Sequence, residues 1–455
     1  MSEWKFDRDA IARFRFVRST LDVDSGEAQL VYAFDDGPEL VETVRFPGAP
    51  FRLDTARRAA VERALRLLHL IAGVSYYKAA VPAHIVVEDG ALDPQTEALL
   101  VEVYENGLGE FAYRNGLALR GNVRFEHAGF PGSGSGGAPA LGLSSRALVA
   151  IGGGKDSLVS IEALRRAGVE QTVGWIGSSQ LIAACAQRTG LPTLTIQRAL
   201  APQLFDFNQN GAYNGHIPVT AVNSAILVVA ALLHDHGQVV FSNERSASYG
   251  SLIPGTGEVN HQWSKGWDFE QRFAALVKST VASDLVYYSL LRPLSELAVA
   301  RQFARSDRYD AHFSSCNRNF HILGPRPASR WCGQCPKCHF VFLALAPFMP
   351  KPRLVAIFGA NLLDEPRLAP GFDALIEYRD HKPFECVGEG QESRAAFAAL
   401  AASPAWREDS LVQRFAREVQ PQLGEQPGLA SLLPAADTHG IPEAVWAKVS
   451  EDFRA

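Results

Sequence analysis

Short apolar segments alternate with segments of helical length and periodicity between residues 146 and 243, and this alternation constrains the fold more than any other feature of the chain. Strands joined by helices over short connections predict a parallel sheet with helices on both faces. We therefore expect an α/β fold with a doubly wound parallel sheet. The expected strands are 146–151, 171–177, 193–196 and 238–243, and the expected helices are 157–167, 180–190 and 218–234.

The chain has 455 residues, which is too long for one ordinary hydrophobic core. The stretch "GFPGSGSGGAP" at 129–139 has the composition of a flexible linker. Before it, a helix is expected to begin after Asp54 as N-cap, and "HIVVED" is expected to form a strand. We expect a mixed α+β domain at 1–128, which is a candidate for substrate binding. A linker at 129–145, the α/β domain at 146–345 and a mostly helical region at 346–455 are expected to follow.

Charge and hydropathy exclude several classes of protein. The net charge is −5, and 47% of the residues are hydrophobic, as in globular proteins without a basic nucleic-acid surface. The longest apolar run, "AILVVAALL" at 225–233, is too short to cross a bilayer. The charged N-terminus has no signal-peptide core. We expect a cytoplasmic protein with neither a nucleic-acid partner nor a membrane segment.

A glycine loop lies at the first strand-to-helix junction, in "IGGGKDS" at 151–157. Val149 stands where a Walker loop has its first glycine, and Ser157 stands where a dinucleotide fingerprint has its third. The backbone of Gly152, Gly153 and Gly154 is free to surround an anion, with a charge from Lys155 and a hydroxyl from Ser157. Asp156 would repel phosphate unless a cation lay between them, so the loop predicts a nucleotide with Mg²⁺.

From Gly153 to Ser157 the loop resembles the Ser-Gly-Gly-x-Asp-Ser loop of the N-type ATP pyrophosphatases, the PP-loop enzymes. Gly152 replaces the first serine of that pattern, which removes one hydroxyl. The resemblance implies that ATP is cleaved between its α and β phosphates. A substrate oxygen would then be adenylated, and the loop would hold the pyrophosphate. The other interpretation of the loop is a tight turn before a capped helix.

Four of the six cysteines are clustered, at positions 316, 332, 335 and 338. Two consecutive C-x2-C steps bring three thiolates to one ion, and Cys316 completes a tetrahedron. Zinc is the first candidate, an iron–sulfur cluster the second and disulfides the third. Four thiolates fill the coordination sphere, so the site is expected to be structural. The pattern Cys-Gly-x-Cys-x-x-Cys resembles the zinc site of 7-cyano-7-deazaguanine synthase, another ATP pyrophosphatase.

Four other stretches combine polar side chains with adjoining apolar elements, at 208–220, 241–250, 259–271 and 381–388. The second begins at the carboxyl end of an expected strand, where open parallel sheets bind ligands. Each stretch also has the composition of a solvated loop. The candidate functional residues in them are Asn214, His216, Asn243, Glu244, Arg245, Asn260, His261, Lys265 and Cys386.

Together these motifs resemble the UDP-N-acetyl-α-D-muramoyl-L-alanyl-L-glutamate epimerases of peptidoglycan synthesis. The likeness rests on "GGGKDS", "NGHIPVTAVNS", "SNERSAS", "VNHQWSK", "SSCNRNF", "RWCGQCPKC" and "HKPFECVG". It implies that ATP and Mg²⁺ drive inversion of the terminal L-glutamate of UDP-MurNAc-L-Ala-L-Glu. Adenylation of the α-carboxylate acidifies the Cα–H, a base then removes the proton, and AMP and pyrophosphate are released. A muramoyl-peptide ligase is the expected neighbour in the reaction sequence.

On this hypothesis Gly152, Gly153, Gly154, Lys155 and Ser157 bind phosphates, and Asp156 binds Mg²⁺. The candidate proton carriers are His216, His261, Lys265 and Cys386, with Glu244 as a base or metal ligand. Cys386 is equally compatible with a buried, inert thiol. Arg245 is expected to hold the γ-carboxylate or a UDP phosphate, and Asn214, Asn243 and Asn260 are further substrate ligands. Two alternatives stay open: an ATP pyrophosphatase that modifies a nucleobase, and a non-enzymatic nucleotide sensor.

Overall fold

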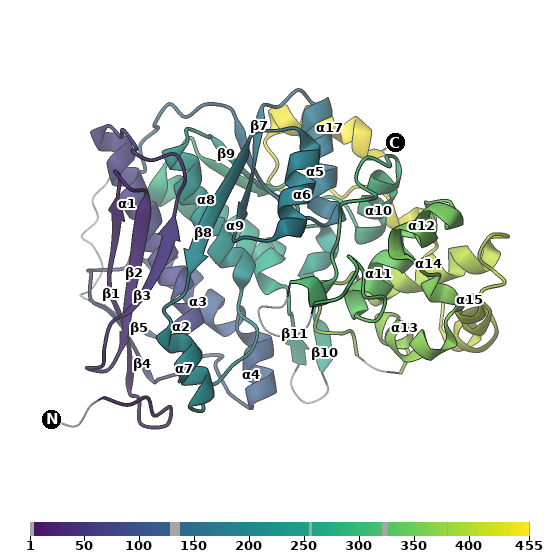
Figure 1. Cartoon of the computed structure of the whole chain (residues 1–455), viewed down its shortest axis with the longest axis horizontal. Coiled ribbons are helices and arrows are strands. Elements are labelled where there is room, and N and C mark those ends of the chain that lie inside the picture. The colour runs from purple at the N-terminus through teal and green to yellow at the C-terminus, as the bar shows by residue number, and fades with distance from the viewer. Residues whose placement is uncertain (1–3, 128–136, 254–256, 321–325, 380, 455) are drawn as a thin grey trace.

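The computed structural model describes residues 4–127, 137–253, 257–320, 326–379 and 381–454. Ten strands form one sheet in the order β12-β9-β6-β7-β8-β3-β2-β1-β4-β5, and β10 and β11 form a separate hairpin (Figure 1). The strands are β1 (Arg13–Asp22), β2 (Glu27–Phe34), β3 (Leu40–Arg45), β4 (His84–Val87), β5 (Phe125–Glu126), β6 (Ala147–Ala150), β7 (Gln171–Ile176), β8 (Thr193–Ala199), β9 (Gln238–Phe241), β10 (Ser251–Ile253), β11 (Gly257–Val259) and β12 (Val286–Ser289).

The helices cover the sheet and form the C-terminal part of the chain. They are α1 (Thr55–Ala72), α2 (Val74–Tyr77), α3 (Pro94–Glu105), α4 (Gly109–Asn115), α5 (Lys155–Arg166), α6 (Gln180–Thr189), α7 (Gln203–Gln209), α8 (Val219–Leu233), α9 (Trp267–Leu276), α10 (Glu296–Ala304), α11 (Pro336–Leu345), α12 (Lys351–Phe358), α13 (Ala369–Leu375), α14 (Gly390–Ala402), α15 (Ser410–Arg414), α16 (Leu429–Leu432) and α17 (Glu443–Arg454). The N-cap expected at Asp54 is confirmed, because its carboxylate accepts a hydrogen bond of 2.8 Å from the Arg57 amide.

The strands β12, β9, β6, β7 and β8 run parallel, which confirms the α/β class and the parallel sheet expected from the alternation. The chain winds from β6 to β7 and β8 on one side, and then returns to place β9 on the other side of β6. Open α/β sheets bind ligands beyond the carboxyl ends of their strands, at the point where the strand order reverses. In this sheet that point lies between β6 and β9.

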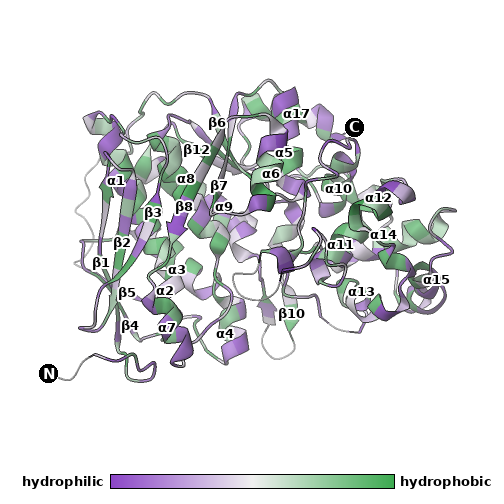
Figure 2. Ribbon diagram, in the orientation of Figure 1, coloured by the Kyte–Doolittle hydropathy of each residue, from purple (hydrophilic) through white to green (hydrophobic). Residues whose placement is uncertain are grey.

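Helices cover both faces of this parallel half. Leu148 and Val239 point into a core that includes α1 and α8, whereas Val149 and Val240 point into a second core that includes α5 and α10. Helix α8 lies inside the first core, and its green colour in Figure 2 shows that it is strongly apolar. Strands buried on both faces carry continuous apolar runs rather than an alternation of apolar and polar residues.

The N-terminal strands extend the same sheet instead of forming a separate one. Strand β3 pairs antiparallel with β8, where Thr43 lies opposite Ala199. A buried ion pair, in which Arg198 Nε lies 2.7 Å from Glu42 Oε1, joins the same two strands. The strand predicted from "HIVVED" is confirmed as β4. The domain limits stay a prediction, and residues 128–136 of the expected linker lie outside the described residues.

The chain after residue 345 is mostly helical, as the sequence predicts, and α12 to α15 lie at the end of the molecule opposite β1 to β5 (Figure 1). The last helix, α17, returns to α5, where the side chains of Arg166 and Asp452 form an ion pair. Within the part of the chain that the structure describes, no helix combines the length and apolar character needed to cross a membrane. The cytoplasmic location stays a prediction.

Candidate active site

The glycine loop connects β6 to α5 at the point where the strand order reverses. Gly153 has a φ of +78°, a conformation that favours glycine, and its carbonyl accepts a hydrogen bond of 2.9 Å from the Ser314 amide. Gly154 is the N-cap of α5, and its carbonyl accepts a hydrogen bond of 3.2 Å from the Ser157 hydroxyl. The loop is thus fixed at the N-terminus of a helix, where backbone N–H groups and the helix dipole favour an anion.

Lys155 is turned into the protein behind this loop. Its side chain is 1% exposed, and its ammonium forms ion pairs with the carboxylates of Asp156 and Glu296. Burial opposes ionisation of Asp156, but the charges of Lys155 and Lys337 hold its pKa below the usual value. The position of Lys155 shows that its charge is balanced by protein carboxylates at this site.

Three carboxylates interact electrostatically beside the loop: Glu244 and Glu296 are buried, and Asp156 is partly exposed. Burial and the neighbouring charge of Asp156 raise the pKa of Glu244. Burial raises the pKa of Glu296 to about 7, although Lys155 opposes the shift. Carboxylate oxygens are the ligand type that Mg²⁺ prefers, although among the described residues these three do not form a group with ligand atoms within 4.8 Å of one another.

A cavity of about 330 Å³ opens at the carboxyl ends of β6 and β9. Gly152, Gly154, Asp156 and Ser157 of the loop line it, which places these predicted residues at one site. From other parts of the chain it receives Asn243, Lys265, Asn317, Lys337 and Cys386. Asn243 also donates a hydrogen bond of 3.0 Å to the Ser289 hydroxyl at the end of β12.

Cys386 is held between two cationic side chains. Lys265 Nζ donates to Cys386 Sγ over 3.1 Å, and His261 also hydrogen-bonds to the thiol. Burial would raise the pKa of Cys386, but Lys265 and His261 together hold it well below the ordinary thiol value. These surroundings favour the thiolate form of Cys386. Its role in proton transfer stays a prediction.

His261 and His216 differ in protonation. Burial lowers the pKa of His261, but hydrogen bonds with Cys386 and Glu110 outweigh it and raise the value to about 9. The ring centroid of His216 lies 4.0 Å from that of His261. Burial and the adjacent charge of His261 lower the pKa of His216 to about 3. The pair therefore provides one protonated and one neutral imidazole near pH 7.

The other predicted substrate residues occupy different surroundings. Asn214 precedes His216 by two residues, and its side-chain oxygen accepts a hydrogen bond of 2.5 Å from Lys78 Nζ. Asn260 donates to the Ala247 carbonyl over 3.1 Å and lines a second cavity. Arg245 follows Glu244 in the 3-10 helix η1 (Arg245–Ser248), but it is not among the residues that line the first cavity.

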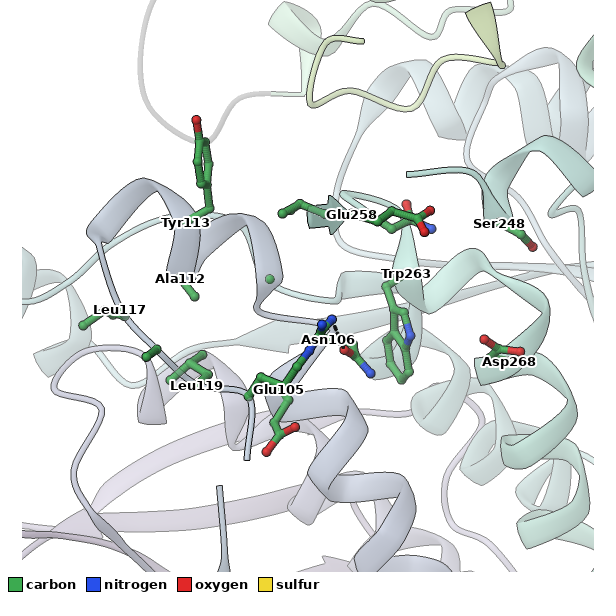
Figure 3. Close-up of a pocket in the computed structure, with 15 residues that line it drawn as sticks. Glu105, Asn106, Ala112, Tyr113, Leu117, Leu119, Ser248, Glu258, Trp263 and Asp268 are labelled. Atoms are coloured by element: carbon green, nitrogen blue, oxygen red, sulfur yellow. Dashed lines mark hydrogen bonds between the residues drawn. The ribbon is translucent and has the colours of Figure 1, made fainter. Parts of the chain in front are cut away.

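A second cavity, of about 530 Å³, is lined by residues of α4 and by Asn260, the neighbour of His261 in the chain. Helix α4 supplies Ala112 and Tyr113 to it, whereas Glu110 of the same helix binds His261. Figure 3 shows the indole of Trp263 between Asn106 and Asp268. The acidic side chains at this cavity are those of Glu105, Glu258 and Asp268, and the basic one is that of Arg120.

The four clustered cysteines meet at the N-terminus of α11. Cys335 is the N-cap of this helix, and its Sγ lies 3.5 Å from that of Cys338 and 4.0 Å from that of Cys316. Cys332 Sγ lies 3.7 Å from Cys338 Sγ. Four thiolates about 2.3 Å from a zinc ion lie about 3.8 Å from one another in a tetrahedron, so the thiols fit such an ion.

Several residues that form the site were not singled out in the sequence. Glu110 comes from a region with no recognisable motif. Glu296 follows the N-cap Ser295 of α10, where a carboxylate is common for helix-dipole reasons. Lys337 lies between two of the clustered cysteines, so its position in a C-x2-C step was the available signal. Buried Arg292 donates hydrogen bonds to the Glu244 carbonyl, over 2.7 Å, and to the Lys265 carbonyl. It thereby joins the polar stretch at 241–250 to the one at 259–271.

The comparisons with known proteins agree over the whole chain. Residues 5–290 match the family model described as the MurL N-terminal domain, and residues 312–429 match the MurL C-terminal domain. A relative from Xanthomonas oryzae pv. oryzae (strain MAFF 311018) is 67% identical over 98% of this chain and 99% of its own length. No solved structure matches the chain.

Two actinobacterial relatives are more distant. One from Salinispora tropica is 44% identical over 88% of this chain and 87% of its own length, and one from a Micromonospora species is 42% identical over 94% and 96%. All three relatives are named UDP-N-acetyl-α-D-muramoyl-L-alanyl-L-glutamate epimerase. These matches do not favour the nucleobase-modifying alternative. The chain belongs to the UDP-N-acetyl-α-D-muramoyl-L-alanyl-L-glutamate epimerase family.

Proposed function

We propose that the protein inverts the terminal L-glutamate of UDP-MurNAc-L-Ala-L-Glu to D-glutamate during synthesis of peptidoglycan precursors, at the expense of ATP. The names of the full-length relatives supply the substrate. The observation that carries the chemistry is the position of the Cys386 thiol, which contacts Lys265 in the cavity that the glycine loop also lines. A group that moves a proton and a loop that suits phosphates thus share one site.

The reaction needs ATP because the Cα–H beside an ionised carboxylate is a very weak acid. An oxygen of the α-carboxylate attacks the α-phosphorus, the bond to the β-phosphate bridge breaks, and pyrophosphate leaves. The Cα proton of the resulting mixed anhydride is far more acidic, since the enolate no longer adds charge to an anion. After reprotonation on the opposite face, water releases AMP and the D-isomer.

The loop is the proposed phosphate site, with a PP-loop type of core around it. The backbone of Gly152 to Gly154 and the Ser157 hydroxyl surround phosphate oxygens, and Lys155 adds positive charge from behind the loop. Asp156 holds Mg²⁺, with Glu244 and Glu296 as neighbouring carboxylates. When bound, Mg²⁺ neutralises phosphate charge. Asp156→Asn is expected to abolish AMP release, and unchanged release by this variant would overturn the assignment.

Cys386 is the first candidate for proton transfer at Cα. The thiolate removes the proton or, when protonated, returns one, while Lys265 and His261 stabilise its ionised form. His216, which is neutral near pH 7, is the candidate for exchange on the opposite face. Glu244 then serves the metal rather than the proton, because it lies beside Asp156.

The substrate is much longer than the glutamate that reacts, so most of it must lie outside the first cavity. The second cavity, with Trp263, Asn106 and Asn260, is the proposed site of the sugar-nucleotide end. Asn214 and Asn243 are placed to bind the peptide, and Arg245 to bind the γ-carboxylate or a phosphate. The four cysteines bind a structural zinc ion, which ties the loop at Cys316 to α11.

The test is incubation of the purified protein with UDP-MurNAc-L-Ala-L-Glu, ATP and Mg²⁺. The glutamate released by acid hydrolysis is then separated by chiral chromatography, and AMP is measured in the same samples. D-Glutamate is expected to appear only with ATP and in step with AMP. Glutamate that stays in the L form while AMP accumulates would contradict the proposal and point to a different adenylated substrate.

A further inference from the structure

The positive charges around the first cavity are not equally available to a ligand. Lys155 is already paired with Asp156 and Glu296 and does not line the cavity. Among the described residues, Lys265 and Lys337 are the basic side chains that line it. Lys265 is bound to Cys386. Lys337 is therefore the cation in this cavity whose charge is not already held by a hydrogen bond.

Lys337 is unusual in its burial. Only 7% of the residue is exposed, and no hydrogen bond or ion pair joins its ammonium to the residues that the structure describes. Lys337 Nζ is not among the buried polar atoms that lack a partner, so the protein covers most of the residue while the ammonium reaches the cavity. An unpaired ammonium that borders a cavity is expected to meet an anionic ligand there.

We infer that Lys337 binds a phosphate group of the nucleotide, opposite the glycine loop; this inference rests on the proposed function. Lys337 borders the same space as Gly152, Gly154 and Ser157. Its charge acts on the acidic groups of Asp156, Glu296, Glu385 and Cys386. Lys337 thus borders the cavity that the phosphate loop and the Cys386 thiol also line, where the α-phosphate and the leaving pyrophosphate would be.

The position of Lys337 gives the four cysteines a second role. Lys337 is the second residue of α11, between the N-cap Cys335 and Cys338. The Cys338 amide donates to Cys335 Sγ over 3.4 Å, so the thiols fix the turn that carries the lysine. An ion held by these thiols would therefore position Lys337 at the cavity without taking part in the reaction.

The experiment compares wild-type protein with Lys337→Met and Lys337→Arg. Calorimetry measures the binding of α,β-methylene-ATP with Mg²⁺, of adenosine, and of UDP-MurNAc-L-Ala-L-Glu. In Lys337→Met the affinity for the ATP analogue is expected to fall on the order of ten- to a hundredfold, as for loss of one charged hydrogen bond. The affinities for adenosine and the dipeptide should stay within about twofold, and Lys337→Arg should retain most of the nucleotide affinity.

Controls separate this effect from misfolding. Lys351→Met removes a lysine on α12 that pairs with Asp409 outside the cavity, and it should leave all three affinities unchanged. Methionine keeps the length of the buried chain, and zinc content and thermal unfolding check that each variant is folded. If Lys337→Met itself does not fold, Lys337→Arg and Lys337→Gln repeat the comparison.

Two results would overturn the inference. One is unchanged affinity for the ATP analogue in folded Lys337→Met. The other is a selective loss of dipeptide affinity, which would make Lys337 a ligand of the substrate carboxylate. Neither result depends on turnover. A wild-type protein that binds the nucleotide but does not epimerise the dipeptide would contradict the proposed function and leave the assignment of Lys337 intact.

Discussion

Lys265 Nζ lies 3.1 Å from Cys386 Sγ, and this contact joins two segments that are 121 residues apart in the chain. Lys265 lies in the region that matches the N-terminal family model, and Cys386 lies in the region that matches the C-terminal one. The surroundings of Cys386 are therefore complete only when both parts of the chain are folded together. The charges that lower its pKa come from Lys265 and His261 of the first part and from Lys337 of the second.

Replacing the thiol should separate adenylation from proton transfer. In Cys386→Ser the glycine loop is unchanged, so AMP release with UDP-MurNAc-L-Ala-L-Glu should continue. Formation of D-glutamate should fall by about 10²- to 10⁴-fold, the usual contribution of a general acid or base. AMP by coupled assay and glutamate by chiral chromatography report the two steps. Full epimerisation by Cys386→Ser would exclude Cys386 as a proton carrier.

Cys185 provides a matched control for this thiol. It is buried in α6, its Sγ donates to the Gly153 carbonyl over 3.6 Å, and burial raises its pKa to about 12. It is therefore neutral at pH 8, whereas the pKa of Cys386 is shifted in the opposite direction, well below the ordinary thiol value. Cys185→Ala should leave epimerisation close to that of the wild type. Equal losses in the two variants would indicate a general structural effect.

The pH dependence of the epimerisation rate should reflect the deprotonation of His261. Its pKa is raised from 6.5 to about 9, so it keeps its proton through neutral pH and loses it as the pH rises through about 9. The epimerisation rate should fall over that range. Glu110→Gln removes one of the groups that raise this pKa, so the fall should begin at lower pH.

Arg114→Gln is the control for Glu110→Gln. Arg114 binds one carboxylate oxygen of Glu110, and His261 binds the other. Loss of Arg114 should therefore leave unchanged the pH range over which the rate falls. Rates measured under substrate saturation from pH 6 to 10 make the comparison. If the rate falls over the same pH range in wild type and in Glu110→Gln, this would contradict the assignment of the fall to His261.

The sequence predicts the parallel half of the fold well, because its signals are local. Strands β6 to β9 and helices α5, α6 and α8 follow from apolar periodicity, the glycine loop and residues such as Gly168, which has a positive φ just after the C-cap of α5. The extension of the sheet through β3 and β8 was not predictable. Thr43 pairs with Ala199, but neither segment contains a sequence pattern that identifies its partner strand. Register between distant strands is a tertiary property.

The site was predicted in part for the same reason. Motifs identified the loop, the thiols and Cys386, since each combines unusual residue types at short spacing. The partners that set their charges come from elsewhere: Glu296 pairs with Lys155 across 141 positions, and Glu110 pairs with His261 across 151. A single acidic residue in a helix carries no sign of its distant partner, so the folded chain was needed to find it.

The buried pair of Lys155 and Glu296 should matter for stability. Glu296→Ala leaves the Lys155 ammonium buried with only Asp156 as a partner, and breaking a buried pair in this way typically costs about 3–5 kcal/mol. Urea unfolding at pH 8, where both groups are charged, measures the loss. Glu39→Ala breaks an exposed pair with Arg18 and should cost less than about 1 kcal/mol. Similar losses in the two variants would contradict the role of burial.

The zinc content of the protein should depend on the four clustered cysteines. Elemental analysis should find one zinc ion per chain, and Cys335→Ser should lose it along with part of its thermal stability. Iron in place of zinc would favour the iron–sulfur alternative. A second metal ion that survives in Cys335→Ser would point to Glu110, His216 and His261, whose candidate ligand atoms lie within 4.8 Å of one another.

The central claim is that one cavity couples ATP cleavage to proton exchange at Cα. Its most direct test is deuterium uptake at the glutamate Cα of UDP-MurNAc-L-Ala-L-Glu in D₂O, measured by mass spectrometry together with AMP. We expect uptake only with both ATP and Mg²⁺, accompanied by inversion. AMP release without deuterium at Cα would contradict the account, because the adenylated substrate would then not pass through a deprotonated carbon.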